Sequence, residues 1–244
     1  MLAEIRKLLP GENIIYFADT ANCPYGPKPA AEIRRLSEQA VGFLIANGAK
    51  LVVVACNTAS SAALAALRAT FPIPFVGMVP AVKPAALTTR TGRVGVIATQ
   101  ATIQAQLFAD LVGQHANGAE VITMACPGLV ALVEAGEVQS PVVEDLLHCY
   151  LDDMLRQGID TLVLGCTHYP FLRPTIERIV GPAVAVIDSG EAVARQVKRV
   201  LEEQGLVAGQ ESGRVTYFAS GEWAPFSRTL SKLGFTPGGG RPPL

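Results

Sequence analysis

Two cysteines, Cys56 and Cys166, lie 110 residues apart in the sequence, and each follows the same kind of short apolar run. Residues 51–55 read Leu-Val-Val-Val-Ala, residues 162–165 read Leu-Val-Leu-Gly, and small polar residues follow each cysteine. Such a run predicts a buried parallel strand, and open α/β sheets bind ligands beyond the carboxyl ends of these strands. If two such ends face each other, a ligand lies between two thiols. This pair could move a proton from one face of a carbon atom to the other.

Two thiols suit this chemistry because a C–H group of this kind is a weak acid and the carbanion that it leaves can be planar. A single base tends to return the proton to the face it left, whereas a thiolate on one face and a thiol on the other invert the centre. Free cysteine titrates near pH ~8.5, so modest tuning gives either form. A lone cysteine is more often a small buried apolar residue, and that simpler interpretation applies to Cys23, Cys126 and Cys149.

The elements that must position these thiols show the same 110-residue offset. Gly48 corresponds to Gly158 and Pro72 to Pro182, which indicates an internal repeat. Strands are predicted at residues 13–18, 50–55, 74–77, 93–98, 120–124, 160–165, 183–188 and 215–219. Amphipathic helices are predicted between them, including one over residues 141–157 whose buried face is Val142, Val143, Leu146, Leu147, Tyr150, Leu151, Met154 and Leu155.

Alternating strands and helices predict an α/β fold with parallel sheets and helices on both faces. The repeat predicts two units related by a pseudo-twofold axis, with the active site between them. We expect residues 1–90 plus 190–244 to form the first unit and residues 91–189 the second. Pro237–Leu244, rich in Gly and Pro, predicts a frayed end.

Composition narrows the class of protein. The 244 residues are 50% apolar and 17% charged, which is typical of a globular protein. A net charge of −1 gives no electrostatic reason to expect nucleic acid or an anionic membrane as a partner. Without a spanning apolar stretch, a secretion signal or CxxC spacing, we expect reduced thiols in the cytoplasm. Only three histidines occur and none has ligand spacing, so we expect no metal site.

Three motifs follow one another in a specific order: Cys23-Pro24-Tyr25-Gly26, Ala55-Cys56-Asn57-Thr58-Ala59 and Gly165-Cys166-Thr167-His168-Tyr169-Pro170. Weaker support comes from Ala125-Cys126-Pro127, Leu132-Val133-Glu134 and Ile187-Asp188-Ser189-Gly190. On these motifs, nearly the whole chain resembles the glutamate racemases. The resemblance implies a cofactor-independent enzyme that converts L-glutamate to D-glutamate for peptidoglycan, and so for cell wall biogenesis and cell shape.

The resemblance also implies roles for single residues. Cys56 and Cys166 would be the two bases, with His168 assisting Cys166 and Glu134 as an acidic helper, unless Glu137 faces inward instead. The residues expected to bind substrate are Tyr25, Gly26, Asn57, Thr58, Thr102, Thr167 and His168. Asn57-Thr58 and Thr167-His168 are predicted to open helices directly after buried strands, where free amides can hold a carboxylate. Asn57, Thr58 and Thr167 could also be only helix caps.

The start of the chain departs from the family pattern. The family opens with a strand and an Asp-Ser-Gly loop that places a carboxylate beside the first cysteine, whereas this chain starts at Met1-Leu2-Ala3-Glu4, within the helix expected after that loop. We therefore expect a strand of the first sheet and that carboxylate to be missing. On this hypothesis the chain is poorly soluble or loosely packed, and it is nearly inactive.

Two alternatives stay open beside a glutamate racemase. An aspartate or related racemase is disfavoured by His168, because the aspartate branch typically has an acidic residue after its Cys-Thr. A catalytically impaired relative that only binds carboxylates is the other. The partner expected in each case is a small molecule, with glutamate first, and neither nucleic acid nor a membrane. The sequence leaves open whether the chain forms a homodimer.

Overall fold

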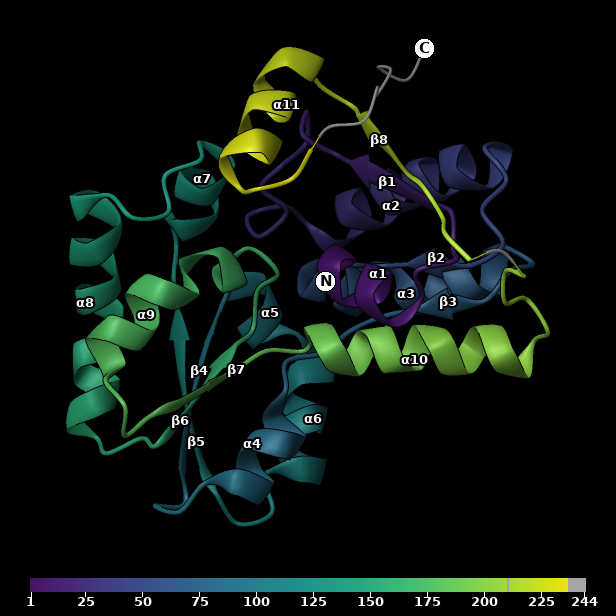
Figure 1. Ribbon diagram of the computed structural model, residues 1–244. Coiled ribbons are helices and arrows are strands. Elements are labelled where there is room, and N and C mark those ends of the chain that lie inside the picture. The colour runs from purple at the N-terminus through teal and green to yellow at the C-terminus, as the bar shows by residue number, and fades with distance from the viewer. Residues whose placement is uncertain (210, 237–244) are drawn as a thin grey trace. The chain divides into compact units, whose positions relative to one another are not determined.

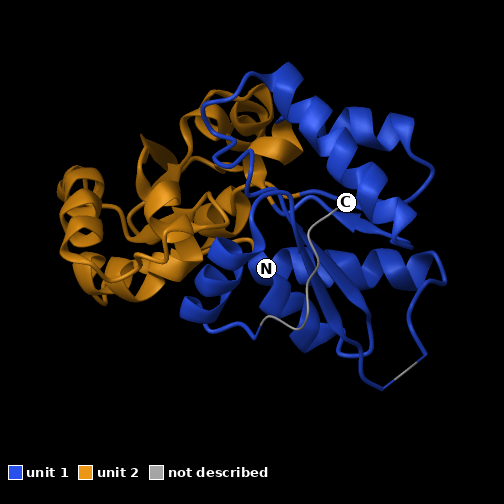
Figure 2. Ribbon diagram, turned by 90° about the horizontal axis from the view of Figure 1, so that it is seen from above, with its two compact units in different colours: residues 1–55, 62–77, 190–244 blue, residues 56–61, 78–189 orange. Residues whose placement is uncertain are grey.

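The computed structural model describes residues 1–209 and 211–236, which form two compact units (Figure 2). Unit 1 comprises residues 1–55, 62–77 and the described part of 190–244, and unit 2 comprises residues 56–61 and 78–189. Unit 2 therefore begins before the predicted crossing at residue 91, because α4 (Val82–Thr88) packs on strands of unit 2. The predicted folding domains stay a prediction, and Pro237–Leu244, expected to be frayed, lies outside the described residues.

The sheet of unit 2 is built from four parallel strands in the order β5-β4-β6-β7. Their bounds are Glu120–Ala125 for β5, Arg93–Ala98 for β4, Thr161–Leu164 for β6 and Ala185–Ile187 for β7. The two central strands, β4 and β6, are almost entirely apolar and buried, as expected for strands covered on both faces. Cys166 follows the end of β6 by two residues.

Alternate residues of these strands contact different helices, as the pleat requires. Val94, Val96 and Val163 pack with α4 and α6 (Gln106–His115) in one apolar cluster. Ile97, Leu162 and Leu164 belong to a second cluster, which includes side chains of α7 (Leu129–Glu134), α8 (Pro141–Arg156) and α9 (Arg173–Val180). Helices thus cover both faces of the sheet (Figure 1), as the sequence predicted.

Helix α8 has a narrower buried face than the sequence predicted. Val143, Leu147, Leu151 and Met154 are each 0% exposed and follow one another at spacings of three or four residues. The prediction that Val142 belongs to this face was wrong. Its side chain is 61% exposed, although it directly precedes the fully buried Val143. Cys149 is exposed as well, which contradicts its interpretation as a buried apolar residue.

Unit 1 contains two separate pairs of parallel strands. β1 (Ile14–Ala18) pairs with β8 (Val215–Ala219), and β2 (Val52–Val53) pairs with β3 (Phe75–Val76); β2 and β3 are shorter than predicted. Among the described residues, no strand joins β1 to β2. The predicted α/β fold with parallel strands is nevertheless confirmed.

Aromatic contacts fix the helices on the β1–β8 pair. The ring of Phe43, on α2 (Ala30–Ala46), lies 5.1 Å from Phe17 and 5.0 Å from Phe218. The ring of Phe226, on α11 (Trp223–Lys232), stacks 6.3 Å from Tyr16. Because Tyr16 and Phe17 point to opposite faces of β1, α2 and α11 cover both faces of this pair. The other helices of unit 1 include α1 (Leu2–Leu8) and α10 (Gly190–Glu203).

Within the described ranges, no helix has both the length and the apolar character needed to span a membrane.

Candidate active site

Cys56 lies where the chain leaves β2 and enters α3 (Asn57–Thr70), at the N-cap position of that helix. Its carbonyl accepts the N–H of Ser60 at 2.8 Å, and its Sγ accepts the N–H of Ala59 at 3.4 Å. Burial raises the pKa of the Cys56 thiol, while the amide of Ala59 lowers it. Cys166 also raises that pKa and His168 lowers it, so both groups lie within electrostatic reach of Cys56. The amide of Ala59, in the first turn of α3, therefore stabilises the thiolate form of Cys56.

A direct hydrogen bond joins the segment of Cys56 to the segment of Cys166. The Nδ2 of Asn57, next to Cys56, donates to the carbonyl of Gly165, next to Cys166, at 2.8 Å. The N–H of Gly165 donates to the carbonyl of Ile97 on β4 at 2.7 Å. A Cβ on Gly165 would lie 2.8 Å from that same carbonyl oxygen, so only glycine fits here. The segments that carry the two candidate bases are thus joined directly within unit 2.

His168 and Glu134 extend a chain of polar groups from Cys166. The Sγ of Cys166 lies 3.8 Å from Nδ1 of His168, and Nε2 of His168 lies 2.6 Å from Oε1 of Glu134. A carboxylate at Nε2 favours the tautomer with its proton there, which leaves Nδ1 to face the thiol as an acceptor. Glu134 is the last residue of α7, whereas Glu137 is exposed beyond that helix. The structure therefore brings together the residues predicted to assist Cys166.

The hydroxyl of Thr58, two residues after Cys56, belongs to a cluster of three threonine hydroxyls. The Oγ1 of Thr58 lies 2.9 Å from Oγ1 of Thr99 and 3.1 Å from Oγ1 of Thr102, and the last two are 2.9 Å apart. Thr99 also caps α5 (Gln100–Gln104), by accepting the N–H of Thr102. Among the described residues, the buried Oδ1 of Asn57 has no hydrogen-bond partner. This set could bind a carboxylate through hydroxyls and an ammonium group through Oδ1.

Thr167 does not occupy the helix start that the sequence predicted. No α-helix begins after Cys166; a single 3₁₀ turn, Tyr169–Leu172, follows, and α9 begins only at Arg173. The prediction of a helix N-terminus at Thr167 and His168 was therefore wrong. The difference has a chemical consequence, because the segment after Cys166 turns its His168 side chain, rather than a row of amides, toward the thiol.

Tyr25 and Gly26 belong to unit 1, in the loop that follows β1. The hydroxyl of Tyr25 donates to Asp19 at 2.6 Å, and Asp19 also accepts from Asn22 at 2.8 Å and from Ser220 at 2.6 Å. Asp19 thus organises the loop, although sequence analysis gave it no role. Its position directly after an apolar strand, like that of Cys56 and Cys166, was the available signal.

Metal binding would require several His, Cys, Asp or Glu side chains close together. Within each unit taken by itself, the described part of the chain holds no group of three such ligands near enough to share an ion.

Comparison with known proteins places these features in a family. The model of the family described as Asp/Glu/Hydantoin racemase matches residues 1–197. A glutamate racemase from Roseiflexus sp. (strain RS-1) is 49% identical over 236 residues, which are 96% of this chain and 87% of the relative.

Solved structures agree with this match. Glutamate racemase isoform RacE1 from Bacillus anthracis has a TM-score of 0.86 at 33% identity, covering 97% of this chain and 90% of that one. Escherichia coli glutamate racemase, in complex with L-glutamate and the activator UDP-MurNAc-ala, has a TM-score of 0.85 at 34% identity, covering 97% of this chain and 91% of that one.

Proposed function

Because the chain belongs to the Asp/Glu/Hydantoin racemase family, we propose that it is a glutamate racemase, which interconverts L-glutamate and D-glutamate. Relatives that cover almost all of this chain carry that name, and the similar Escherichia coli enzyme was crystallised with L-glutamate. The observation that carries the proposal is the pair of thiols, Cys56 and Cys166, tied together through Asn57 and Gly165. An aspartate racemase is not favoured, since the closely similar relatives are named for glutamate.

In the proposed mechanism, the two thiols exchange one proton through the substrate. The thiolate of one cysteine removes the Cα proton, and the electron pair left behind spreads into the neighbouring carboxylate. The thiol of the other cysteine then gives its proton to the opposite face of Cα. One S–H bond forms and another breaks, so no cofactor is needed to balance the reaction. Conversion in the reverse direction exchanges the two roles.

Each thiol has its own means of holding charge. The N–H of Ala59, at the positive end of the α3 dipole, stabilises a thiolate at Cys56. His168, held by Glu134, accepts the proton of Cys166 or returns it. The Ala59 amide offsets part of the rise that burial causes in the pKa of the Cys56 thiol, and the imidazole of His168 gives the proton of Cys166 a nearby acceptor.

Substrate binding is proposed to combine hydroxyls with one amide oxygen. The cluster of Thr58, Thr99 and Thr102 offers three hydroxyl groups to a carboxylate. The buried Oδ1 of Asn57 suits the substrate ammonium, because an acceptor left unpaired in the interior is costly. Tyr25, Gly26 and Thr167 stay predictions as further contacts.

The cellular role follows from the proposed reaction. We propose that the D-glutamate is used for peptidoglycan in the cytoplasm, and hence in cell wall biogenesis and cell shape. Among macromolecules we expect neither nucleic acid nor a membrane as a partner. Light scattering on the purified protein distinguishes a monomer from a homodimer.

The test is conversion of L-glutamate to D-glutamate, followed by chiral chromatography, with purified protein dialysed against EDTA and no cofactor added. We expect both enantiomers to reach equal concentrations from either side, with no pyridoxal absorbance. L-Aspartate serves as the control substrate and should be converted far more slowly. A chain that binds glutamate without converting it would instead support the impaired carboxylate-binding alternative.

A further inference from the structure

The turn between β5 and α7, Cys126-Pro127-Gly128, is held by two tyrosine hydroxyls from other parts of unit 2. Tyr169 donates to the carbonyl of Cys126 at 3.3 Å, and Tyr150 of α8 donates to the carbonyl of Pro127 at 2.7 Å. The N–H of Cys126 donates to the carbonyl of Ala98, at the end of β4, at 3.0 Å. Three hydrogen bonds therefore fix the point from which α7 departs.

The turn decides where Glu134 lies, because α7 has only six residues and Glu134 is its last. Leu129 and Val133 of α7 are 0% and 1% exposed and share an apolar cluster with Tyr169. A short helix held by its first residue and one buried face has little freedom to move at its other end. A displacement of the turn would therefore move the carboxylate that lies 2.6 Å from His168.

Tyr169 connects this turn to the thiol itself. It directly follows His168, its N–H donates to the carbonyl of Cys166 at 3.1 Å, and its side chain is 0% exposed. Burial raises the pKa of the Tyr169 hydroxyl, so the group remains a donor at every pH at which the enzyme works. One residue thus contacts the backbone of Cys166 on one side and the start of α7 on the other.

We propose that Tyr169, supported by Tyr150, is a positioning residue that holds Glu134 against His168 and so keeps His168 ready to assist Cys166. This inference rests on the proposed function, because it concerns the proton transfer at Cys166. It also gives the Ala125-Cys126-Pro127 motif a role: its backbone carbonyls, not the thiol of Cys126, receive the two tyrosines.

The test uses Tyr169→Phe, which removes the hydroxyl and keeps the ring. We expect kcat to fall about 5- to 50-fold, as misplaced catalytic groups do. KM should change less than about twofold, because the hydroxyl donates to the backbone carbonyl of Cys126, a residue to which no substrate contact is assigned. Tyr217→Phe is the matched control, since Tyr217 is a buried tyrosine of unit 1, 2% exposed. It should leave kcat unchanged.

A second measurement separates positioning from general damage. The primary isotope effect is measured with L-glutamate and with D-glutamate, each deuterated at Cα. Slower transfer at Cys166 should raise the isotope effect for the enantiomer whose Cα–H faces Cys166, and not for the other. His168→Asn should give the same asymmetry, and combining it with Tyr169→Phe should add little further loss.

Isotope effects that stay unchanged for both enantiomers while kcat falls would overturn the positioning role, and so would a wild-type kcat. If Tyr169→Phe does not fold, Tyr150→Phe, at a half-buried site, must show the same asymmetry at smaller size. Failure of the proposed function is a separate outcome: the unmodified protein would then not racemise glutamate at all.

Discussion

The surroundings of Cys56 and Cys166 differ more than their sequences suggest. Each thiol follows an apolar strand, yet Cys56 caps an α-helix and accepts an amide N–H, whereas Cys166 opens a turn and faces the ring of His168. Cys56 therefore has a backbone amide as its hydrogen-bond partner, whereas Cys166 has the side-chain pair His168–Glu134. A repeat can supply equivalent positions for two bases, while each base acquires its own way of holding charge.

The largest expected effect comes from removing either thiol. Cys56→Ser and Cys166→Ser should each reduce racemisation by at least ~10³-fold, since a hydroxyl is a far weaker base than a thiolate and each face needs its own group. Chiral chromatography of the products measures this loss. Cys149→Ser, at an exposed site on α8, is the control and should keep full activity. Near-normal turnover by either active-site variant would contradict the two-thiol mechanism.

The next largest effect is expected from a change at Gly165, whose carbonyl accepts the hydrogen bond from Asn57 that joins the segments of Cys56 and Cys166. Gly165→Ala places a Cβ 2.8 Å from the carbonyl oxygen of Ile97, so the backbone before Cys166 must shift. We expect activity to fall by about 10²-fold, because catalytic groups tolerate little displacement, together with a lower melting temperature. Gly42→Ala on α2, where a Cβ meets nothing within 4 Å, should change neither activity nor melting adversely. Equal behaviour of the two variants would show that the close contact at Gly165 is unimportant.

Replacing Glu134, which is proposed to assist Cys166 through His168, should distinguish the surroundings of the two thiols further. Glu134→Gln keeps the shape of the side chain but removes the charge that orients His168, so kcat should fall by about 10- to 100-fold. Glu137→Gln, in the exposed segment after α7, is the matched control. Steady-state kinetics with both enantiomers measures the effect. If Glu137→Gln were the more damaging change, the assignment of Glu134 would be reversed.

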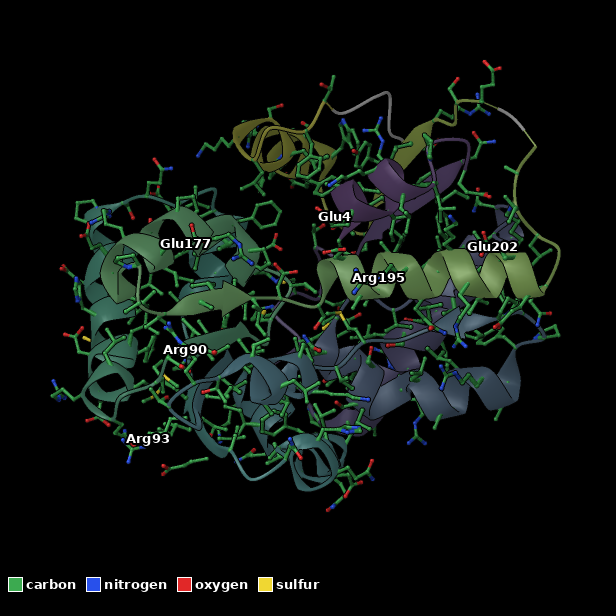
Figure 3. All side chains as sticks on the ribbon, turned by 60° about the horizontal axis from the view of Figure 1, so that its bottom comes forward. Glu4, Arg90, Arg93, Glu177, Arg195 and Glu202 are labelled. Atoms are coloured by element: carbon green, nitrogen blue, oxygen red, sulfur yellow. The ribbon has the colours of Figure 1, made fainter. Side chains whose placement is uncertain are left out.

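The smallest expected effect on turnover comes from changing Asp160, which lies away from both thiols. Its carboxylate accepts hydrogen bonds from the hydroxyl of Thr89 and from the amides of Arg90 and Thr91. Figure 3 labels Arg90, in the loop between α4 and β4, and Arg93, the first residue of β4. Burial raises the pKa of Asp160, but these hydrogen bonds outweigh it and bring the pKa to about 2.

Because the folded-state pKa of Asp160 is depressed, its contribution to stability is present above about pH 4 and is lost as the pH falls toward 2. Asp160→Asn should cost about 1–3 kcal/mol at pH 7 and progressively less in acid. Thermal unfolding between pH 3 and pH 7 checks this. A variant whose deficit is the same at both pH values would contradict the linkage, and turnover should change little.

Much of the fold could be predicted from the sequence, since strands such as β4 and β8 are marked by their apolar runs. Apolar periodicity does not show how a chain leaves a strand. The same pattern at Cys56 and Cys166 therefore predicted two helix starts, of which only the one at Asn57 exists. Val142 was misplaced for a related reason: an apolar residue can lie on the exposed edge of a helix face.

The candidate site, like the fold, could be predicted only in part from the sequence. The paired spacing together with the family motifs selected the two thiols as candidates, but partners distant in sequence depend on tertiary structure. The bond from Asn57 to Gly165 and the contact of Thr99 with Thr58 cross between elements, so no local pattern reveals them. Asp19, bonded to Tyr25 and Ser220, did carry a local signal, its position directly after an apolar strand, but its partner Ser220 is distant in sequence.

The central claim is that Cys56 and Cys166 each serve one face of the substrate α-carbon. The most direct measurement is elimination of HCl from the two enantiomers of a glutamate that carries chlorine on Cβ, because elimination needs only one base. We predict that Cys56→Ser and Cys166→Ser each retain elimination from one enantiomer only, and that the two variants prefer opposite enantiomers. The same preference in both variants, or no elimination by either while both remain folded, would contradict the assignment of one thiol to each face.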